Sequence, residues 1–199
     1  MKKMIAMLLV TLMSLSLVAC GSSEETATEE TAAVEVVVEG AETEEVAVEE
    51  VVVDNTPVLV VGETATTDKC EFTIDYVNIT KDVMPPKPGN WYSHYEAEAG
   101  KVYVDFCVAY KNTSGNNVGA DDVIFANLKY AGKYEYTGFS MIEEDSRADF
   151  TYSNITSIAP LSTEYVHYLF EVPEEVATSS ESVEITFNID GNTYTYKVR

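Results

Sequence analysis

The chain has 199 residues and a formal net charge of −22, from 34 acidic and 12 basic residues. This length allows one ordinary domain with additional segments. The acidity argues against a nucleic-acid partner, because phosphate contacts require clustered Lys and Arg. The charge is uneven: residues 1–20 carry +2, residues 21–56 carry −12 without a basic residue, and residues 57–199 carry −12. We therefore interpret three parts separately.

Residues 1–19 have the layout of a secretory signal, because Lys2 and Lys3 precede an uncharged apolar run. A membrane-spanning helix is the competing interpretation, but it needs about 20 apolar residues and this run is shorter. The run ends in Leu-Val-Ala before Cys20. This ending resembles a bacterial lipobox, in which the Cys carries a diacylglycerol and becomes the new N-terminus. An ordinary signal peptide with a nearby Cys is the alternative. The resemblance implies a lipoprotein signal peptide over 1–19 and lipidation of Cys20.

Residues 20–56 are predicted to form an acidic low-complexity linker after the lipidated Cys20. The segment consists almost wholly of Glu, Val, Ala and Thr, and it contains no aromatic residue. Without large apolar groups it cannot bury enough surface to offset the entropy of ordering, and its charges repel one another. We expect a disordered spacer that holds a domain away from the membrane.

Residues 57–199 show the two-residue periodicity of β-strands. Apolar and polar residues alternate over 70–76, 102–109, 165–172 and 183–189, as in strands with one buried face. In the first stretch, Cys70, Phe72, Ile74 and Tyr76 share the expected core face. Two turn signals, Asp190-Gly191 and Ala131-Gly132, predict hairpins. They join 182–189 to 193–198 and 124–130 to 133–139.

Six to eight short strands over about 140 residues predict an all-β domain, an immunoglobulin-like antiparallel β-sandwich. A closed barrel is the alternative. Short segments also occur in a familiar order and spacing: VGET at 61–64, FTI at 72–74, GKVYV at 100–104, YKNT at 110–113, and APL at 159–161 before LFEVP at 169–173.

With these segments, residues 57–199 resemble the DUF4352 domain, a telokin-like and immunoglobulin-like sandwich of Gram-positive surface lipoproteins. The chain departs from the family at Leu161-Ser162, where Pro-Gly is usual. The resemblance implies an architecture and a location outside the cytoplasm, anchored by lipid to the cell membrane of a Gram-positive bacterium. It implies no chemistry, because the family is one of unknown function.

Cys70 and Cys107 are the two cysteines of the predicted domain. An extracytoplasmic compartment favours a disulfide, but the alternation places Cys70 on the core face and Cys107 on the opposite face. A disulfide across the core requires both thiols to point inward. We therefore favour a buried Cys70 and a partly exposed Cys107, while a bulge that reverses one parity would restore the disulfide.

No catalytic, metal-binding or cofactor site is predicted. His94 and His167 lack the spacing of zinc ligands, and the sequence has neither a nucleophile elbow nor a phosphate-binding glycine loop. Carboxylates cluster at 121–122 and at 143–145 with Asp149. These could bind calcium weakly, although a solvated acidic surface is the simpler interpretation.

The segment 81–100 contains Trp91, Tyr92, His94 and Tyr95 after a proline-rich stretch. Aromatic residues on the loops of a rigid sandwich often contact ligands, or they fold down over an open end of the sandwich. We hypothesise a non-enzymatic binding or adaptor module of the cell envelope, whose partner is an envelope protein or ligand. The alternatives are a structural envelope lipoprotein without a specific ligand and a weak divalent-metal-binding module.

Overall fold

The computed structural model describes residues 55–144 and 146–199. The predicted signal peptide (1–19), the lipidated Cys20 and all but the last two residues of the linker (20–56) lie outside the described residues.

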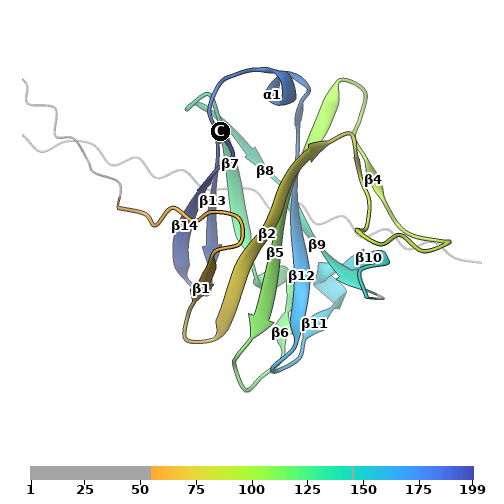
Figure 1. Cartoon of the computed structure of the whole chain (residues 1–199), viewed down its shortest axis with the longest axis vertical. Helices are drawn as coiled ribbons and strands as arrows, with labels where there is room; N and C mark the ends of the chain where they lie inside the picture. The colour runs from red at the N-terminus through yellow and green to blue at the C-terminus, as the bar shows by residue number, and fades with distance from the viewer. Residues whose placement is uncertain (1–54, 145) are drawn as a thin grey trace, which may run out of the picture. The chain divides into compact units, whose positions relative to one another are not determined.

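The larger of two principal sheets has six antiparallel strands (Figure 1). The two longest pairings join β5 to β2 and to β12, so these three strands form its centre. In spatial order the strands are β1 (Thr64–Thr66), β2 (Cys70–Thr80), β5 (Lys101–Asn112), β12 (Thr163–Pro173), β9 (Phe139–Glu144) and β10 (Asp149–Tyr152).

The smaller sheet has four antiparallel strands and contains both hairpins that the sequence predicts. Asp190 and Gly191 have φ of 50° and 78°, and Ala131 and Gly132 have φ of 52° and 70°. Two successive positive φ values are typical of the turns that match the twist of a hairpin. Both hairpin predictions are therefore confirmed. In spatial order the strands are β14 (Asn192–Lys197), β13 (Val183–Ile189), β7 (Phe125–Tyr130) and β8 (Tyr134–Thr137).

Short elements complete the described part of the chain. Two two-stranded sheets lie in the connections, and helical turns follow β6, β10 and β12. The elements are β3 (Asp82–Val83) with β4 (Tyr95–Glu96), β6 (Val118–Gly119) with β11 (Ser157–Ile158), the 3-10 turns η1 (Ala120–Asp122) and η2 (Ser153–Ile155), and α1 (Glu175–Thr178).

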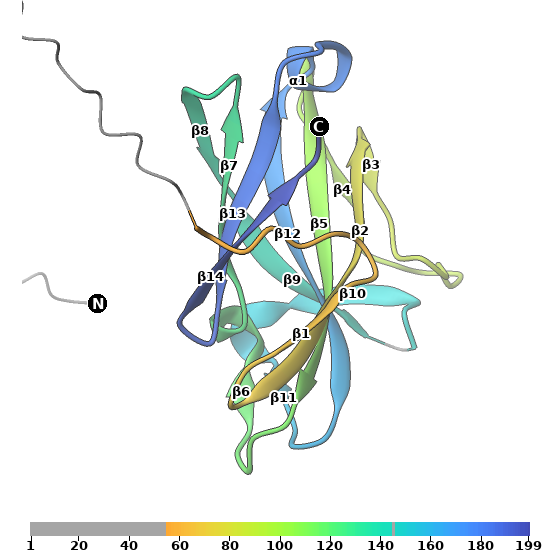
Figure 2. The same cartoon turned by 60° about the vertical axis from the view of Figure 1, so that its left-hand side comes forward.

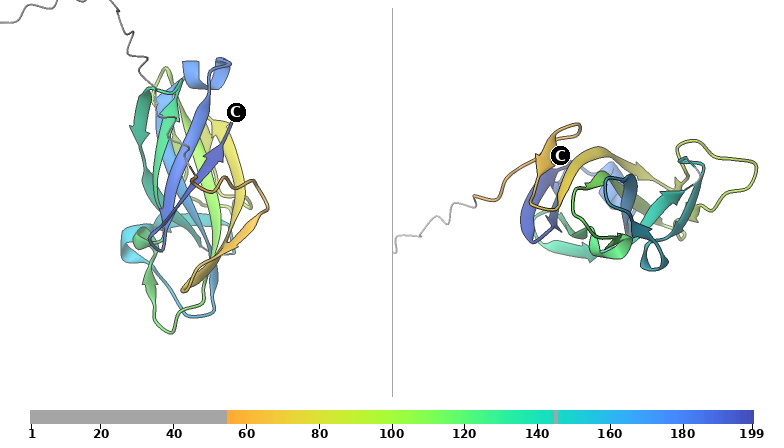
Figure 3. Two further views of the ribbon diagram at one scale, coloured as in Figure 1. Left: turned by 90° about the vertical axis from the view of Figure 1, so that its left-hand side faces the viewer. Right: turned by 90° about the horizontal axis from the view of Figure 1, so that it is seen from below.

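The two principal sheets lie face to face and enclose the main core (Figure 3). Phe72 and Phe106 from the large sheet pack against Phe187 from the small sheet, with ring centroids 6.3 and 5.0 Å apart. The predicted all-β sandwich is confirmed. The barrel alternative is wrong, because the sheets are separate rather than closed on one another.

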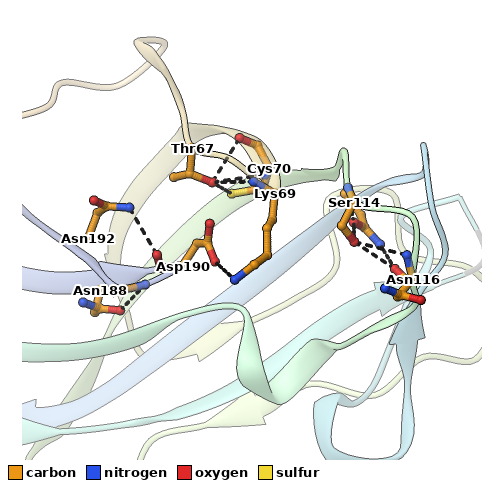
Figure 4. A network of polar contacts seen from close by, with 10 residues as sticks. Thr67, Lys69, Cys70, Ser114, Asn116, Asn188, Asp190 and Asn192 are labelled. Carbon is orange, nitrogen blue, oxygen red and sulfur yellow. Dashed lines mark hydrogen bonds and ion pairs between the residues drawn. The ribbon is translucent and has the colours of Figure 1, made fainter.

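Polar contacts join the turns of both sheets at one end of the sandwich (Figure 4). Lys69, between β1 and β2, forms an ion pair of 2.7 Å with Asp190 in the β13–β14 turn. Asn188 Oδ1 accepts a hydrogen bond from the Gly191 amide, and Asn192 donates to the Asp190 carbonyl. The Lys69–Asp190 ion pair therefore fixes the β13–β14 turn beside the turn that joins β1 to β2.

A second apolar cluster lies on the outer face of the large sheet, where sequence alternation predicts solvent-exposed residues. Segment 81–100, which includes β3 and β4, covers this face. Tyr95 and Ala97 from this segment pack on the cluster. The buried residues of the cluster are Val83, Tyr103, Met141, Phe150 and Leu169.

A β-bulge interrupts the predicted alternation of β2. Ile74 pairs with Val108 and Tyr76 with Cys107, so Asp75 is an extra residue in the ladder. A bulge re-aims the side chains that follow it. Tyr76 therefore lies on the outer face, and its predicted place on the core face beside Cys70 and Ile74 is wrong.

Candidate functional site

The loop between β3 and β4 is held to the β9–β10 turn by backbone hydrogen bonds. The Lys87 amide donates to the Arg147 carbonyl at 3.0 Å, and the Gly89 amide donates to the Ala148 carbonyl at 3.3 Å. The Ser93 amide donates to Asp149 Oδ1 at 2.6 Å. Figure 2 shows this loop beside β10, projecting from the body of the sandwich. The loop is therefore tethered on both sides of its tip.

The four aromatic residues predicted to form a binding loop have different environments. The Trp91 side chain is 92% exposed, whereas Tyr92 is 38% exposed. Tyr92 packs edge-on against His94, with ring centroids 6.2 Å apart. Tyr95 instead packs on Phe139 and Phe150 in the second apolar cluster. The loop does fold down through Tyr95, but onto the outer face of the large sheet rather than over an open end.

His94 is fixed by an acidic neighbour at the base of the loop. Its Nδ1 lies 2.7 Å from Oδ1 of Asp82 in β3. This hydrogen bond and the charge of Asp82 raise the pKa of His94 above its ordinary value. The structure therefore groups Tyr92 and His94, leaves Trp91 projecting from the surface, and assigns Tyr95 to packing.

Sequence reasoning missed a buried polar network on the outer face of the same sheet. His167 in β12 lies between two carboxylates: Nδ1 is 2.7 Å from Asp105 Oδ1, and Nε2 is 2.9 Å from Glu143 Oε1. All three side chains are almost completely inaccessible to solvent. Phe150 and Tyr76 pack edge-on against the imidazole. Because both ring nitrogens face carboxylates, the network suits a doubly protonated, cationic imidazole.

The electrostatics of the network agree with this protonation state. Burial by itself lowers the pKa of His167, but the hydrogen bonds with Asp105 and Glu143 oppose burial and hold the pKa well above 6.5. Burial raises the pKa of the Cys107 thiol, so that thiol is neutral at neutral pH. The carboxylates are therefore the anions that stabilise the imidazolium.

Arg147 extends the network from the β9–β10 turn. Its Nε donates to Glu143 Oε2 at 2.6 Å, and its Nη2 donates to Asp75 Oδ2 at 2.8 Å. The guanidinium also lies 3.6 Å from the centroid of the Tyr165 ring. Burial raises the pKa of Glu143, but the bonds from His167 and Arg147 outweigh it and the pKa lies below the ordinary value. The bulge residue Asp75 thus provides one anchor of the network.

Cys107, Glu143 and His167 are residue types that bind metal ions, and their ligand atoms lie within 4.8 Å of one another. Sequence spacing did not indicate this cluster, because each residue comes from a different strand. The donor set fits an ion poorly, since Arg147 donates to both oxygens of Glu143. A divalent ion there would lie beside a guanidinium and would require deprotonation of a thiol whose pKa is raised by burial. The arrangement is better described as a paired ionic network.

The acidic cluster at 143–145 with Asp149 does not converge in the described part of the chain. Glu143 is buried against Arg147, whereas Glu144 is exposed. Asp149 accepts hydrogen bonds from the Ser93 and Phe150 amides. Asp145 lies outside the described residues. Glu143 therefore holds Arg147 in the β9–β10 turn, and Asp149 holds the aromatic loop to β10.

Cys107 differs from its sequence-based prediction. Both cysteines of the domain are free and buried. As the alternation of residues along the strands predicts, Cys70 points into the core and the two cysteines form no disulfide. The predicted partial exposure of Cys107 is wrong, because other segments of the chain cover this part of the outer face of the large sheet. His167 lies beside Cys107 on the neighbouring strand β12 and helps to enclose the thiol.

Comparison with solved structures assigns the chain to a family. An uncharacterized β-sandwich protein from Clostridium difficile 630, with a crystal structure at 1.90 Å, is 37% identical over 72% of this chain and 95% of that chain. The TM-score is 0.69. The chain belongs to the family of this clostridial β-sandwich protein. Membership of this β-sandwich family establishes the fold, but it does not indicate a ligand or a reaction.

Other comparisons add little to this family assignment. A conserved hypothetical protein from Bacillus anthracis, solved at 2.2 Å, is 12% identical, with a TM-score of 0.48 over 70% of this chain and 94% of that chain. This likeness is too distant to carry an argument. No protein-family model matches the chain. No curated protein matches it either. Within residues 55–144 and 146–199, no helix is long and apolar enough to cross a bilayer.

Proposed function

We propose that this member of the clostridial β-sandwich family is a non-enzymatic binding module of the cell envelope, anchored to the membrane by lipid on Cys20. Trp91 carries the binding role. Large aromatic side chains are rarely left in water, and an exposed one on a tethered loop is typical of a contact residue. Its 92% exposure contrasts with the packed Tyr95 four residues later.

The tethering of the loop supports this proposal physically. The backbone bonds to Arg147 and Ala148 and the Ser93–Asp149 bond restrict the loop before binding. A restricted loop loses less conformational entropy when a partner docks, so more of the contact energy appears as affinity. The buried network supports the same turn from below, since Arg147 provides both the guanidinium of the network and the carbonyl that binds Lys87.

The anchor rests on the sequence, and the resemblance to DUF4352 supports the same location. Two acyl chains hold a protein stably at a membrane, at about 0.8 kcal/mol for each buried methylene. The acidic segment 21–56 would then repel an anionic membrane surface and keep the sandwich at a distance. We propose that the partner belongs to this extracytoplasmic space and is an envelope protein or polymer.

Fluorescence of Trp91 tests the binding role, because it is the only tryptophan in the chain. We expect purified wall polymer or envelope membrane protein to shift its emission to shorter wavelength, as docking removes water from the indole. Trp91→Ala should lose retention on the same fraction. Tyr152→Ala is the matched control, because Tyr152 is also an exposed aromatic residue, at 67%.

Unchanged emission in every fraction, together with equal retention of Trp91→Ala and wild type, would favour the structural lipoprotein without a specific ligand. A separate experiment tests the anchor. Cys20→Ala should leave the protein unprocessed or release it from the membrane, as seen by intact mass and fractionation. Normal processing and full membrane retention of Cys20→Ala would contradict the anchor and leave the Trp91 test unaffected.

A further inference from the structure

Three tyrosines gather at the free edge of the small sheet. In the β7–β8 hairpin, Tyr130 pairs with Tyr134, and Leu128 pairs with Tyr136. Opposed residues of an antiparallel pair share one face, as do residues two apart along a strand. Leu128 is fully buried in the core between the sheets. The three tyrosines therefore lie on the core-facing side of the hairpin, where purely apolar residues would be the usual choice.

These tyrosines line a cavity of about 280 Å³ instead of closing the core completely. The wall opposite the hairpin comes from the end of β12 and from α1. Figures 1 and 2 show α1 and the β7–β8 turn at the same end of the domain. The lining residues are Tyr130, Tyr134, Tyr136, Pro173, Glu175 and Val176.

Hydrogen bonds and stacking fix this wall. The Tyr130 hydroxyl lies 2.8 Å from Ser179 Oγ and 3.2 Å from Glu175 Oε1. The Tyr130 and Tyr134 rings stack with centroids 6.1 Å apart and planes inclined by 25°. The aromatic wall is thus preformed, and Glu175 is held at its rim.

The electrostatic character of the cavity favours a cation. Aromatic faces carry partial negative charge, and Glu175 adds a carboxylate, whereas no Lys or Arg lines the cavity. Lys133 places its exposed ammonium nitrogen 4.5 Å from the centroid of Tyr134, which shows that this ring accepts a cation; a ligand cation would replace that contact. An anion would be repelled by Glu175 and by the negative faces of the tyrosine rings, and a purely apolar ligand would gain nothing from either.

We propose that this tyrosine cage binds a quaternary ammonium group, such as the trimethylammonium head of choline. The three tyrosine rings and Glu175 present negative potential to such a group, whose charge is spread over methyl groups, so that its removal from water costs little. A primary ammonium is less suitable, because it would lose strong hydration for few hydrogen-bond acceptors. The cage shares no residue with the Trp91 loop, so the proposal is independent of the proposed envelope-binding role.

Calorimetric titration of the full chain in a non-ionic detergent tests the cage. The probes are choline and 3,3-dimethyl-1-butanol, which has the same shape without the charge. We expect saturable binding of choline and at least about tenfold weaker binding of the uncharged alcohol. Both the cation–π contact with the tyrosines and the attraction to the Glu175 carboxylate require a positive charge on the ligand. Equal binding of the two, or no binding of choline, would overturn the proposal.

Substitutions test the assigned residues. Tyr134→Ala should weaken choline binding by at least about fivefold, and Glu175→Gln should weaken it while keeping the side-chain shape. Both side chains are exposed, at 47% for Tyr134, so folding should be retained and is checked by the melting temperature. Tyr152→Ala and Trp91→Ala are controls that should bind choline as the wild type does. Wild-type affinity in Tyr134→Ala would overturn the cage.

Two further probes identify the source of the group. Phosphocholine carries the same trimethylammonium head on an anionic ester, and n-butylammonium imitates a lysine side chain. Tighter binding of free choline supports a small-molecule ligand, because Glu175 repels the phosphate, whereas tighter binding of phosphocholine supports an esterified headgroup. Binding of n-butylammonium without binding of choline would overturn the quaternary assignment.

Discussion

The Nδ1 atom of His167 lies 2.7 Å from Oδ1 of Asp105, and both side chains are buried on the outer face of the large sheet. The two residues come from adjacent strands, where His167 pairs with Cys107 and Asp105 pairs with Leu169. The imidazole therefore reaches diagonally across the ladder to the carboxylate. This contact joins β5 to β12 by charge, in addition to the backbone hydrogen bonds of the ladder.

His167→Leu should destabilise the fold by about 3–5 kcal/mol, because it leaves the buried Asp105 carboxylate without its cationic partner. Urea unfolding measures the free-energy change. His94→Leu is the control, since His94 is an exposed histidine that also pairs with an aspartate, and it should change stability by about 0.5 kcal/mol or less. Similar losses for the two variants would contradict the buried ion pair.

The stability of the wild type should depend on pH at both ends of the range. The pKa of His167 is raised in the folded state, so its contribution is complete below about pH 6.5 and is lost as the pH rises through the folded-state pKa. The pKa of Glu143 is lowered, so its contribution is present above about pH 4.3 and is lost as the pH falls through the folded-state pKa.

Unfolding free energies measured from pH 3 to pH 10 check this dependence. His167→Gln should show a flatter alkaline limb than the wild type, because it cannot release the proton. Parallel alkaline limbs would mean that His167 is not charged in the folded protein.

Gly138→Ala should destabilise the sandwich by about 1–3 kcal/mol or more. A Cβ at this position would lie 2.2 Å from the carbonyl oxygen of Leu169, so the backbone of β12 would have to move. Gly115→Ala is the control, because a Cβ at Gly115 meets no atom within 4 Å. Thermal unfolding compares the two variants. Equal melting temperatures would contradict the close approach of Gly138 to β12.

Neither thiol of the domain should react in the folded protein. Cys70 and Cys107 are free and fully buried, and burial raises the pKa of both. In Cys20→Ser protein without reductant, a thiol reagent should therefore label no cysteine before unfolding and two after unfolding. A rapidly labelled cysteine would contradict the burial of Cys107, and no labelled cysteine after unfolding would reveal a disulfide.

The candidate binding loop was only partly predictable from sequence. The aromatic residues between two long strands indicate a loop, and Trp91 is exposed there as a contact residue would be. Nothing in the local sequence separates Trp91 from Tyr95. Their environments differ because Tyr95 lies in β4, where pairing with Val83 directs it toward Phe139 and Phe150.

The buried network was missed for a related reason. Its members come from β5, β9, β12 and the bulge in β2, so no short stretch of sequence contains two partners in ion-pair contact except Glu143 and Arg147. A bulge adds a single residue and has no compositional signature, and Asp75 looks like an ordinary polar position in the alternation. The pattern consequently placed Tyr76 in the core.

Local sequence patterns predict the long strands, both hairpins of the small sheet and the opposite orientations of Cys70 and Cys107. These features depend on periodicity and turn residues, which are local. Contacts between distant segments bury part of the outer face of the large sheet, place His167 between two carboxylates, and bring three tyrosines to one cavity. A two-residue period distinguishes the two faces of a strand, but it does not tell whether a distant segment such as 81–100 covers the second face.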